Sequence, residues 1–282
     1  MYPTTTLKRI TLLFLLLFLS FSSVSFAESV RLPAISKSSG HQQTGSFVWF
    51  DLVTPDRAKA RTYYEKLFGW KISKAAGEDD YDLITNRGTL IGGIAEIKGE
   101  EQSVWLGSLS ITNVKEAVDR VKQLGGKVLE PVQQVDDRGV MAVVEDNMGA
   151  AFVVLDTGSR DPAVRKVRPG DWLWTDLFTT DMAKSGKFYK ALAGLQPKTV
   201  SGSKKMQIDL LTPNGKKKSG MVKIPWKHVT PTWLPYIQVK NLTSTMKRSV
   251  QLGGQLFFKF KGGAILLDPT GAAFGIQQVK GK

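Results

Sequence analysis

The residues best suited to chemistry in this 282-residue sequence are two tryptophan–aspartate pairs, Trp49 with Asp51 and Trp174 with Asp176. The second pair follows the first by 125 residues. Residues two apart on a strand point to the same face, so each indole would share a surface with its carboxylate. Aromatic walls with a few polar groups are typical of pockets for organic molecules, and indole faces attract cations. We expect one shared cup that binds a flat or cationic organic molecule, with Asp51 or Asp176 as the counter-charge.

The same four residues permit other interpretations. Two close carboxylates could share a proton and act as acid and base, or hold a hard divalent ion through oxygen. Alternatively, the indoles fill a core, as large aromatic side chains commonly do, and the carboxylates accept hydrogen bonds from nearby backbone amides. Four further side chains are expected to line the cup and to hydrogen-bond to a ligand. The alternative is that they are ordinary polar residues of the strands. They are Ser108, Ser110, Tyr236 and Gln238.

The composition removes several kinds of chemistry. The chain has no cysteine, which excludes a disulfide, a thiolate nucleophile and a cysteine-ligated metal. Its only histidines are His41, in a polar leader, and His228, in an expected loop. The sequence contains no nucleophile elbow, phosphate-binding loop or dinucleotide fingerprint. Serine hydrolysis, nucleotide binding and histidine-ligated metal chemistry are therefore not indicated.

A strand, a turn and a helix must position each pair. Residues 47–69 begin with the alternating pattern of a strand. Helix signals follow: Thr54 can cap the helix, Pro55 suits its first position and Asp56 suits its positive end. Gly69 is a typical left-handed helix stop. Residues 172–194 repeat this sequence pattern, so the same strand, turn and helix should position the second pair.

The repeat extends over both halves of the chain. Residues 105–111 match 233–239, Gly125-Gly126 match Gly253-Gly254, and the turn at Asp146 matches the turn at Asp268. Each half is predicted as strand, helix and strands, twice over. This order predicts an α+β fold of tandem paired βαβββ modules that form a cup-shaped, partly closed mixed sheet. The expected divisions are a signal peptide (1–27), a flexible leader (28–44), module 1 (45–156), a linker (157–168) and module 2 (169–279).

The sequence resembles the vicinal oxygen chelate superfamily in four motifs, which are WFDLVTPD, YYEKLFGW, VWLGSLSI and DNMGAAFVVLD. That superfamily includes glyoxalase I, bleomycin-resistance proteins, fosfomycin-resistance enzymes and ring-cleaving dioxygenases. The sequence is most similar to the two-module glyoxalase-like branch, over nearly all of residues 45–279. The resemblance implies a cup that holds a metal ion or an organic ligand, and lyase or dioxygenase chemistry.

The resemblance also implies where metal ligands would lie, and this sequence departs from that pattern. The corresponding positions are Trp49, Leu106 and Val153 in module 1, and Trp174, Leu234 and Gly275 in module 2. None of these side chains can ligate a metal in the usual way. We therefore expect no metal and no other cofactor.

The N-terminus and the charge distribution bear on location. Lys8 and Arg9 precede an apolar run, and Ser25-Phe26-Ala27 is a suitable cleavage site, which together predict a signal peptide cleaved near Ala27 and a periplasmic or extracellular protein. The alternative is an uncleaved anchor, for which the run is short. Residues 165–282 carry 21 lysines and arginines against 5 acidic residues. This excess is either a solvated surface or a means of binding an anionic envelope surface.

These observations favour an exported glyoxalase-like protein that binds a small organic molecule, aromatic or cationic, in the cup between the modules without a metal. One alternative is a lyase, isomerase or dioxygenase-type enzyme that uses an oxygen-ligated ion or the Asp51/Asp176 pair. Another is a basic, envelope-associated interaction protein. No nucleic-acid partner is indicated, and the chain is expected to be a monomer or a homodimer.

Overall fold

The computed structural model describes residues 32–37, 39–99, 102–135, 137–199, 207–226 and 228–279. The expected signal peptide lies outside these residues. Among the residues described, no helix is long and apolar enough to cross a membrane.

Module 1 contains two βαβββ units in sequence. Its elements are β1 (Phe47–Thr54), α3 (Arg57–Phe68), β2 (Lys71–Lys74), β3 (Tyr81–Asn86), β4 (Thr89–Glu96), β5 (Val104–Ser110), α4 (Val114–Gln123), β6 (Lys127–Val135), β7 (Gly139–Glu145) and β8 (Ala151–Asp156). The eight strands form one mixed sheet in the order β2-β3-β4-β1-β5-β8-β7-β6.

Module 2 repeats this arrangement. Its elements are β9 (Trp172–Thr179), α5 (Met182–Ala193), β10 (Gln196–Thr199), β11 (Gln207–Leu211), β12 (Lys217–Lys223), β13 (Thr232–Val239), α6 (Leu242–Gln251), β14 (Gln255–Phe260), β15 (Gly263–Leu267) and β16 (Ala273–Gln278). The sheet order is β10-β11-β12-β9-β13-β16-β15-β14. The predicted α+β class and the paired βαβββ arrangement are confirmed, and neither sheet closes into a barrel.

The helix that follows each Trp–Asp strand begins and ends as its sequence dictates. The side chains of Asp56 and Asp181 accept hydrogen bonds from the backbone N–H of Lys59 and Lys184, at 2.9 and 3.0 Å. Asp56 is therefore the N-cap of α3, whereas Thr54, the expected cap, ends β1. The helices stop at Gly69 and Gly194, whose φ angles of 70° and 67° suit glycine.

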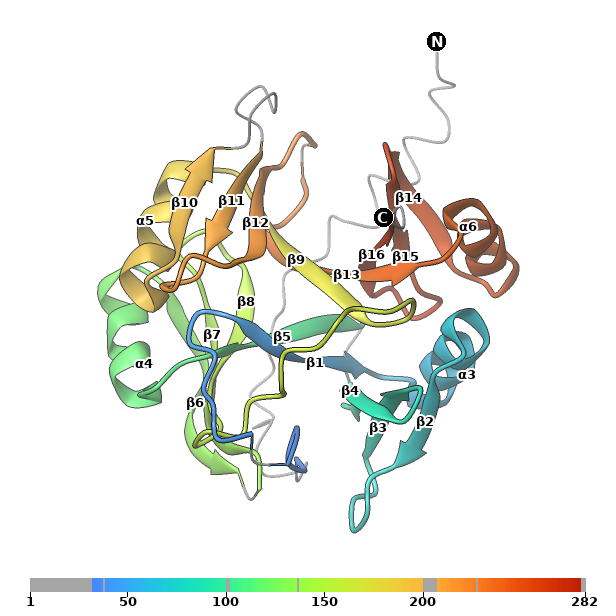
Figure 1. The fold of residues 1–282 in the computed structure, drawn as a ribbon, viewed down its shortest axis with the longest axis horizontal. Coiled ribbons are helices and arrows are strands. Elements are labelled where there is room, and N and C mark those ends of the chain that lie inside the picture. Colours follow the sequence, from blue (N-terminus) through green and yellow to red (C-terminus); the bar gives the residue numbers. More distant parts are fainter. Residues whose placement is uncertain are drawn as a thin grey trace.

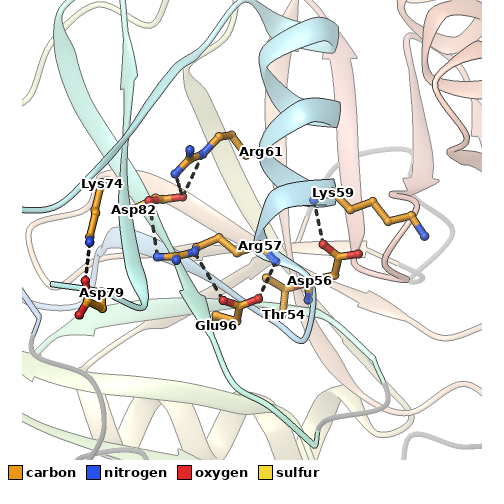
Figure 2. A network of polar contacts seen from close by, with 9 residues as sticks. All are labelled: Thr54, Asp56, Arg57, Lys59, Arg61, Lys74, Asp79, Asp82 and Glu96. Atoms are coloured by element: carbon orange, nitrogen blue, oxygen red, sulfur yellow. Dashed lines mark hydrogen bonds and ion pairs between the residues drawn. The ribbon is translucent and has the colours of Figure 1, made fainter.

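Ion pairs fix α3 on its sheet (Figure 2). Asp82 on β3 is fully buried and accepts from Arg61, while the Arg57 guanidinium lies 3.6 Å from Asp82 and 3.7 Å from Glu96 on β4. Because adjacent strand residues point to opposite faces, Asp82 meets the helix and Tyr81 points to the other face of the sheet. The helix is thereby tied to the strand that carries Tyr81.

The modules pack through their helix-bearing faces. One apolar core combines β1 and α3 residues such as Leu52 and Tyr63 with β13 and α6 residues such as Ile237 and Met246. A second core combines α4 residues such as Val121 with α5 residues such as Phe188. In Figure 1, α3 accordingly lies beside α6 and α4 beside α5, and the two curved sheets open in opposite directions.

Two crossed hydrogen-bond sets, which we call the latch, join the modules. Tyr64 of α3 donates to Asp268 in module 2 at 2.9 Å and accepts from Trp105 at 2.8 Å. The repeat-related set joins Tyr189 of α5 to Asp146 in module 1 at 2.8 Å, with Trp233 as donor at 2.7 Å. Each aspartate also accepts backbone N–H bonds within its own turn. The repeated tyrosines therefore serve packing between modules.

We predict that Tyr64→Phe and Tyr189→Phe each destabilise the protein by about 1–3 kcal/mol, because each change leaves a buried carboxylate oxygen and an indole N–H without a partner. Urea unfolding at pH 7 measures the loss. Lys59→Ala, at an exposed α3 position, is the control and should be neutral. Tyrosine variants that matched this control would contradict the assignment of the latch.

Candidate functional site

The predicted site residues lie on the face of each sheet that is turned away from the helices, which we call the cup face. Trp49, Asp51 and Ser108 come together on the cup face of module 1, where they are 1%, 6% and 1% exposed. Trp174, Asp176 and Tyr236 come together on the cup face of module 2. The expectation of one cup shared by both Trp–Asp pairs is therefore wrong, because the modules meet through their helix faces. Asp51 and Asp176 are not placed to share a proton or an ion.

In module 1 the carboxylate of Asp51 is enclosed by other side chains of the same module, which form a cage around it. Asp51 Oδ1 accepts from Trp49 Nε1 at 2.8 Å and from the Tyr81 hydroxyl at 2.5 Å. Arg138 Nη1 lies 3.0 Å from Asp51 Oδ2, and its Nη2 donates to the Tyr81 oxygen at 2.9 Å. The guanidinium carbon also lies 5.3 Å from the Trp49 ring and 5.7 Å from the Tyr81 ring. Arg138 is therefore the counter-charge of Asp51.

The electrostatics keep this cage charged and closed. Burial alone would lower the pKa of Arg138, but neighbouring Tyr81 and Asp51 raise it, so the guanidinium stays protonated. Burial is the main reason that the pKa of Tyr81 is raised above its ordinary value, so its hydroxyl remains a donor. With both carboxylate oxygens engaged, Asp51 is not available as a general base or as counter-charge for a cationic ligand.

The N-terminal segment covers this cage. Leu32 and Ile35 are 3% and 2% exposed and belong to the same apolar cluster as Trp49, Leu106 and Val153. Arg138 Nε donates to the carbonyl oxygen of Pro33 at 2.9 Å. Over residues 32–37, the leader expected to be flexible is therefore packed, because its two aliphatic side chains fill an apolar cup.

Module 2 pairs its carboxylate with a tyrosine from a different strand. The Tyr236 hydroxyl hydrogen-bonds to Asp176; burial chiefly, and then the charge of Asp176, raise the pKa of Tyr236 well above its ordinary value. Glycines make room for both carboxylates. A Cβ at Gly93 would lie 2.8 Å from Asp51 Oδ1, and one at Gly220 would lie 2.3 Å from Asp176 Oδ1.

A series of aromatic rings extends from this pair, and we call it the aromatic face. Successive ring centroids are 5.1–6.5 Å apart; the rings are Trp174, Tyr236, Phe260, Phe258 and Trp226. Phe258 is 41% exposed, and Trp174, Trp226 and Phe260 are half-buried. Phe260 is the last residue of β14 and pairs with Gly263 across the β14–β15 turn.

The residues at the family's metal positions do not fit a metal. In module 1 these positions are occupied by Trp49, Leu106 and Val153, under the covering Ile35. In module 2 the Tyr236 ring occupies the side-chain space at Gly275, where a Cβ would lie 2.1 Å from a ring carbon. Within the described part of the chain, no three His, Cys, Asp or Glu side chains are grouped closely enough to hold an ion.

One predicted site residue, Gln238, and the features that the sequence interpretation did not predict remain to be placed. Gln238 is half-buried, and its backbone bonds to Gly170 and Asp171, just before β9. The sequence interpretation missed the arginine cage, the covering segment and most of the aromatic face. The available signals were apolar Leu32 and Ile35 in a polar leader, and the dense aromatic text of residues 257–260.

Comparison with known proteins identifies the fold family. Residues 46–154 match the model of the Glyoxalase/Bleomycin resistance protein/Dioxygenase superfamily. Module 1 matches the model of this superfamily, and module 2 repeats the strand order of module 1. The resemblance seen in the sequence is confirmed.

Relatives over most of the chain support this assignment. The anthracycline biosynthesis protein DauV of Streptomyces sp. (strain C5) is 28% identical over 84% of this chain and 94% of its own length. CFP32 of Mycobacterium tuberculosis (strain CDC 1551 / Oshkosh), named as a glyoxylase, is 26% identical over 81% of this chain and 92% of its own length.

Solved structures share the fold alone. The Mn(II)-bound glyoxalase from Novosphingobium aromaticivorans has a TM-score of 0.56 and 13% identity, over 84% of this chain and 83% of its own. Homoprotocatechuate 2,3-dioxygenase from B. fuscum has a TM-score of 0.58 and 13% identity, over 88% of this chain and 75% of its own.

We predict that Arg138→Met destabilises the protein by about 3–5 kcal/mol, because it strands the buried charge of Asp51. The double variant Arg138→Met with Asp51→Leu should recover a substantial part of this loss, since it removes the charge as well. Urea unfolding of the two variants and the wild type decides the matter. A double variant as unstable as the single one would contradict the cage.

Proposed function

We propose that this protein binds a flat aromatic organic molecule on the cup face of module 2, without a metal ion. The observation that carries the proposal is the aromatic face, whose half-buried and exposed rings extend from the Asp176–Tyr236 pair. Aromatic rings prefer offset-stacked or edge-to-face contact, worth about 0.5–1.5 kcal/mol per pair beyond the area that they bury. Several such contacts would hold a planar ligand, and the polar pair would orient it.

The difference between the modules supports the choice of module 2. In module 1, the cup is filled by Leu32 and Ile35 and its charged groups are mutually engaged. In module 2, the ring of Phe260 lies beside Tyr236, with a centroid distance of 6.2 Å, so the surface next to the polar pair is apolar. Apolar rings that remain partly exposed on a folded protein commonly mark a binding surface.

The names of two relatives agree with a planar aromatic ligand. DauV and DnrV are both described as anthracycline biosynthesis proteins, and anthracyclines are polycyclic aromatic compounds. Their identity to this chain is 28%, so the comparison suggests a class of molecule and not a particular substrate.

We predict that a fluorescent anthracycline binds the purified protein saturably, and that Phe258→Ala and Trp226→Ala each weaken binding about tenfold, since each removes a ring from the surface. Fluorescence titration gives the dissociation constants. Val250→Ala is the matched control, because Val250 is an exposed apolar residue of the same module on α6. Equal loss in all three variants, or none, would reject the aromatic face as the site.

We further propose that the protein is exported. The support is the basic, apolar and small-residue pattern of residues 1–27. Expression of the full chain in a bacterial host should give a soluble exported protein whose first residue is Glu28, as intact mass and N-terminal sequencing would report. A protein retained in the membrane with Met1 intact would contradict cleavage.

A further inference from the structure

We infer that the cup of module 1 is a receptor site for an extended apolar molecule with a carbonyl oxygen, and that residues 32–37 occupy it as an exchangeable ligand of the same chain. This inference concerns a different cup from the proposed aromatic site, so either can fail without the other.

The segment contacts the cup as a ligand would. Leu32 and Ile35 insert into the apolar cluster formed by Trp49, Leu106 and Val153, and both are at most 3% exposed. Between these two anchors, the Pro33 carbonyl accepts from Arg138 Nε at 2.9 Å. Two apolar anchors and one directed polar contact are the usual elements of a small-ligand site.

The receptor side is held in place by groups other than the segment. Arg138 is fixed by Asp51, by the Tyr81 hydroxyl and by two aromatic rings, all from module 1. Its Nε is the donor left for a ligand, and it points to the Pro33 oxygen. A pre-positioned donor of this kind favours binding because little ordering is required.

The segment itself is joined to the fold weakly. Among the described residues, no strand pairing or backbone–backbone hydrogen bond involves residues 32–37. Besides the Pro33 contact, the Ser36 hydroxyl bonds to the Arg160 carbonyl at 2.6 Å, and the backbone forms an isolated bridge only further on, at His41. The apolar anchors and Arg138 therefore provide most of its attachment.

The test separates the segment from the chain after folding. A protease recognition sequence is inserted after Ser39, next to the exposed Gly40 and His41, and the folded protein is cut. A fluorescent peptide of residues 28–37 is then added, and anisotropy follows its binding. Competing peptides carry Ile35→Asp, at a buried anchor, or Lys37→Ala, at an exposed position.

We expect saturable binding of the labelled peptide to the cut protein and none to the uncut protein, whose own segment fills the cup. The Ile35→Asp peptide should compete at least about tenfold more weakly than the parent peptide, and the Lys37→Ala peptide equally well. The cut protein freed of its segment should retain its circular dichroism spectrum. Loss of fold on release, or no exchange with a protein that stays folded, would overturn the inference. Anthracycline binding by the same cut protein reports on the aromatic face separately.

Discussion

A buried carboxylate on the first strand of each module determines what each cup can contain. A charge in an apolar surrounding is stable only when it is paired and hydrogen-bonded. Module 1 meets this requirement with Arg138, Tyr81 and Trp49 around Asp51. Module 2 places Tyr236, from a different strand, against Asp176. In module 1, Arg138 gives a closed cup with a polar centre, and its Nε donates to the Pro33 carbonyl oxygen. In module 2, Tyr236 leaves room for aromatic rings such as that of Phe260.

The packing of the modules makes this divergence possible. Because the helix-bearing faces meet and are joined by the latch, each cup face is turned away from the other module (Figure 1). The shared cores consist of residues from both modules, so they constrain both halves equally. The cup faces are not part of these cores and are free to differ. One repeated scaffold can therefore carry one cup occupied by its own chain and another lined by rings.

Much of the scaffold was predictable from sequence, because it depends on local and repeated signals. Asp56, Gly69 and their counterparts 125 residues later set the helix ends, and the alternation of β1 correctly put Trp49 and Asp51 on one face. The single cup was not correct, because the direction in which two modules pack depends on contacts such as Tyr64–Asp268, which are 204 residues apart. The pairing of Arg138 with Asp51 was missed for the same reason, since 87 residues separate them.

The seven indole N–H signals of the protein can report whether the two cups have different occupants. A two-dimensional nitrogen–proton NMR spectrum would be recorded while an anthracycline is added. We expect the Trp174 and Trp226 signals to shift saturably, while the signal of Trp49, which is hydrogen-bonded beneath the N-terminal segment, stays in place. A shift of the Trp49 signal with no change at Trp174 and Trp226 would instead place the anthracycline in the cup of module 1.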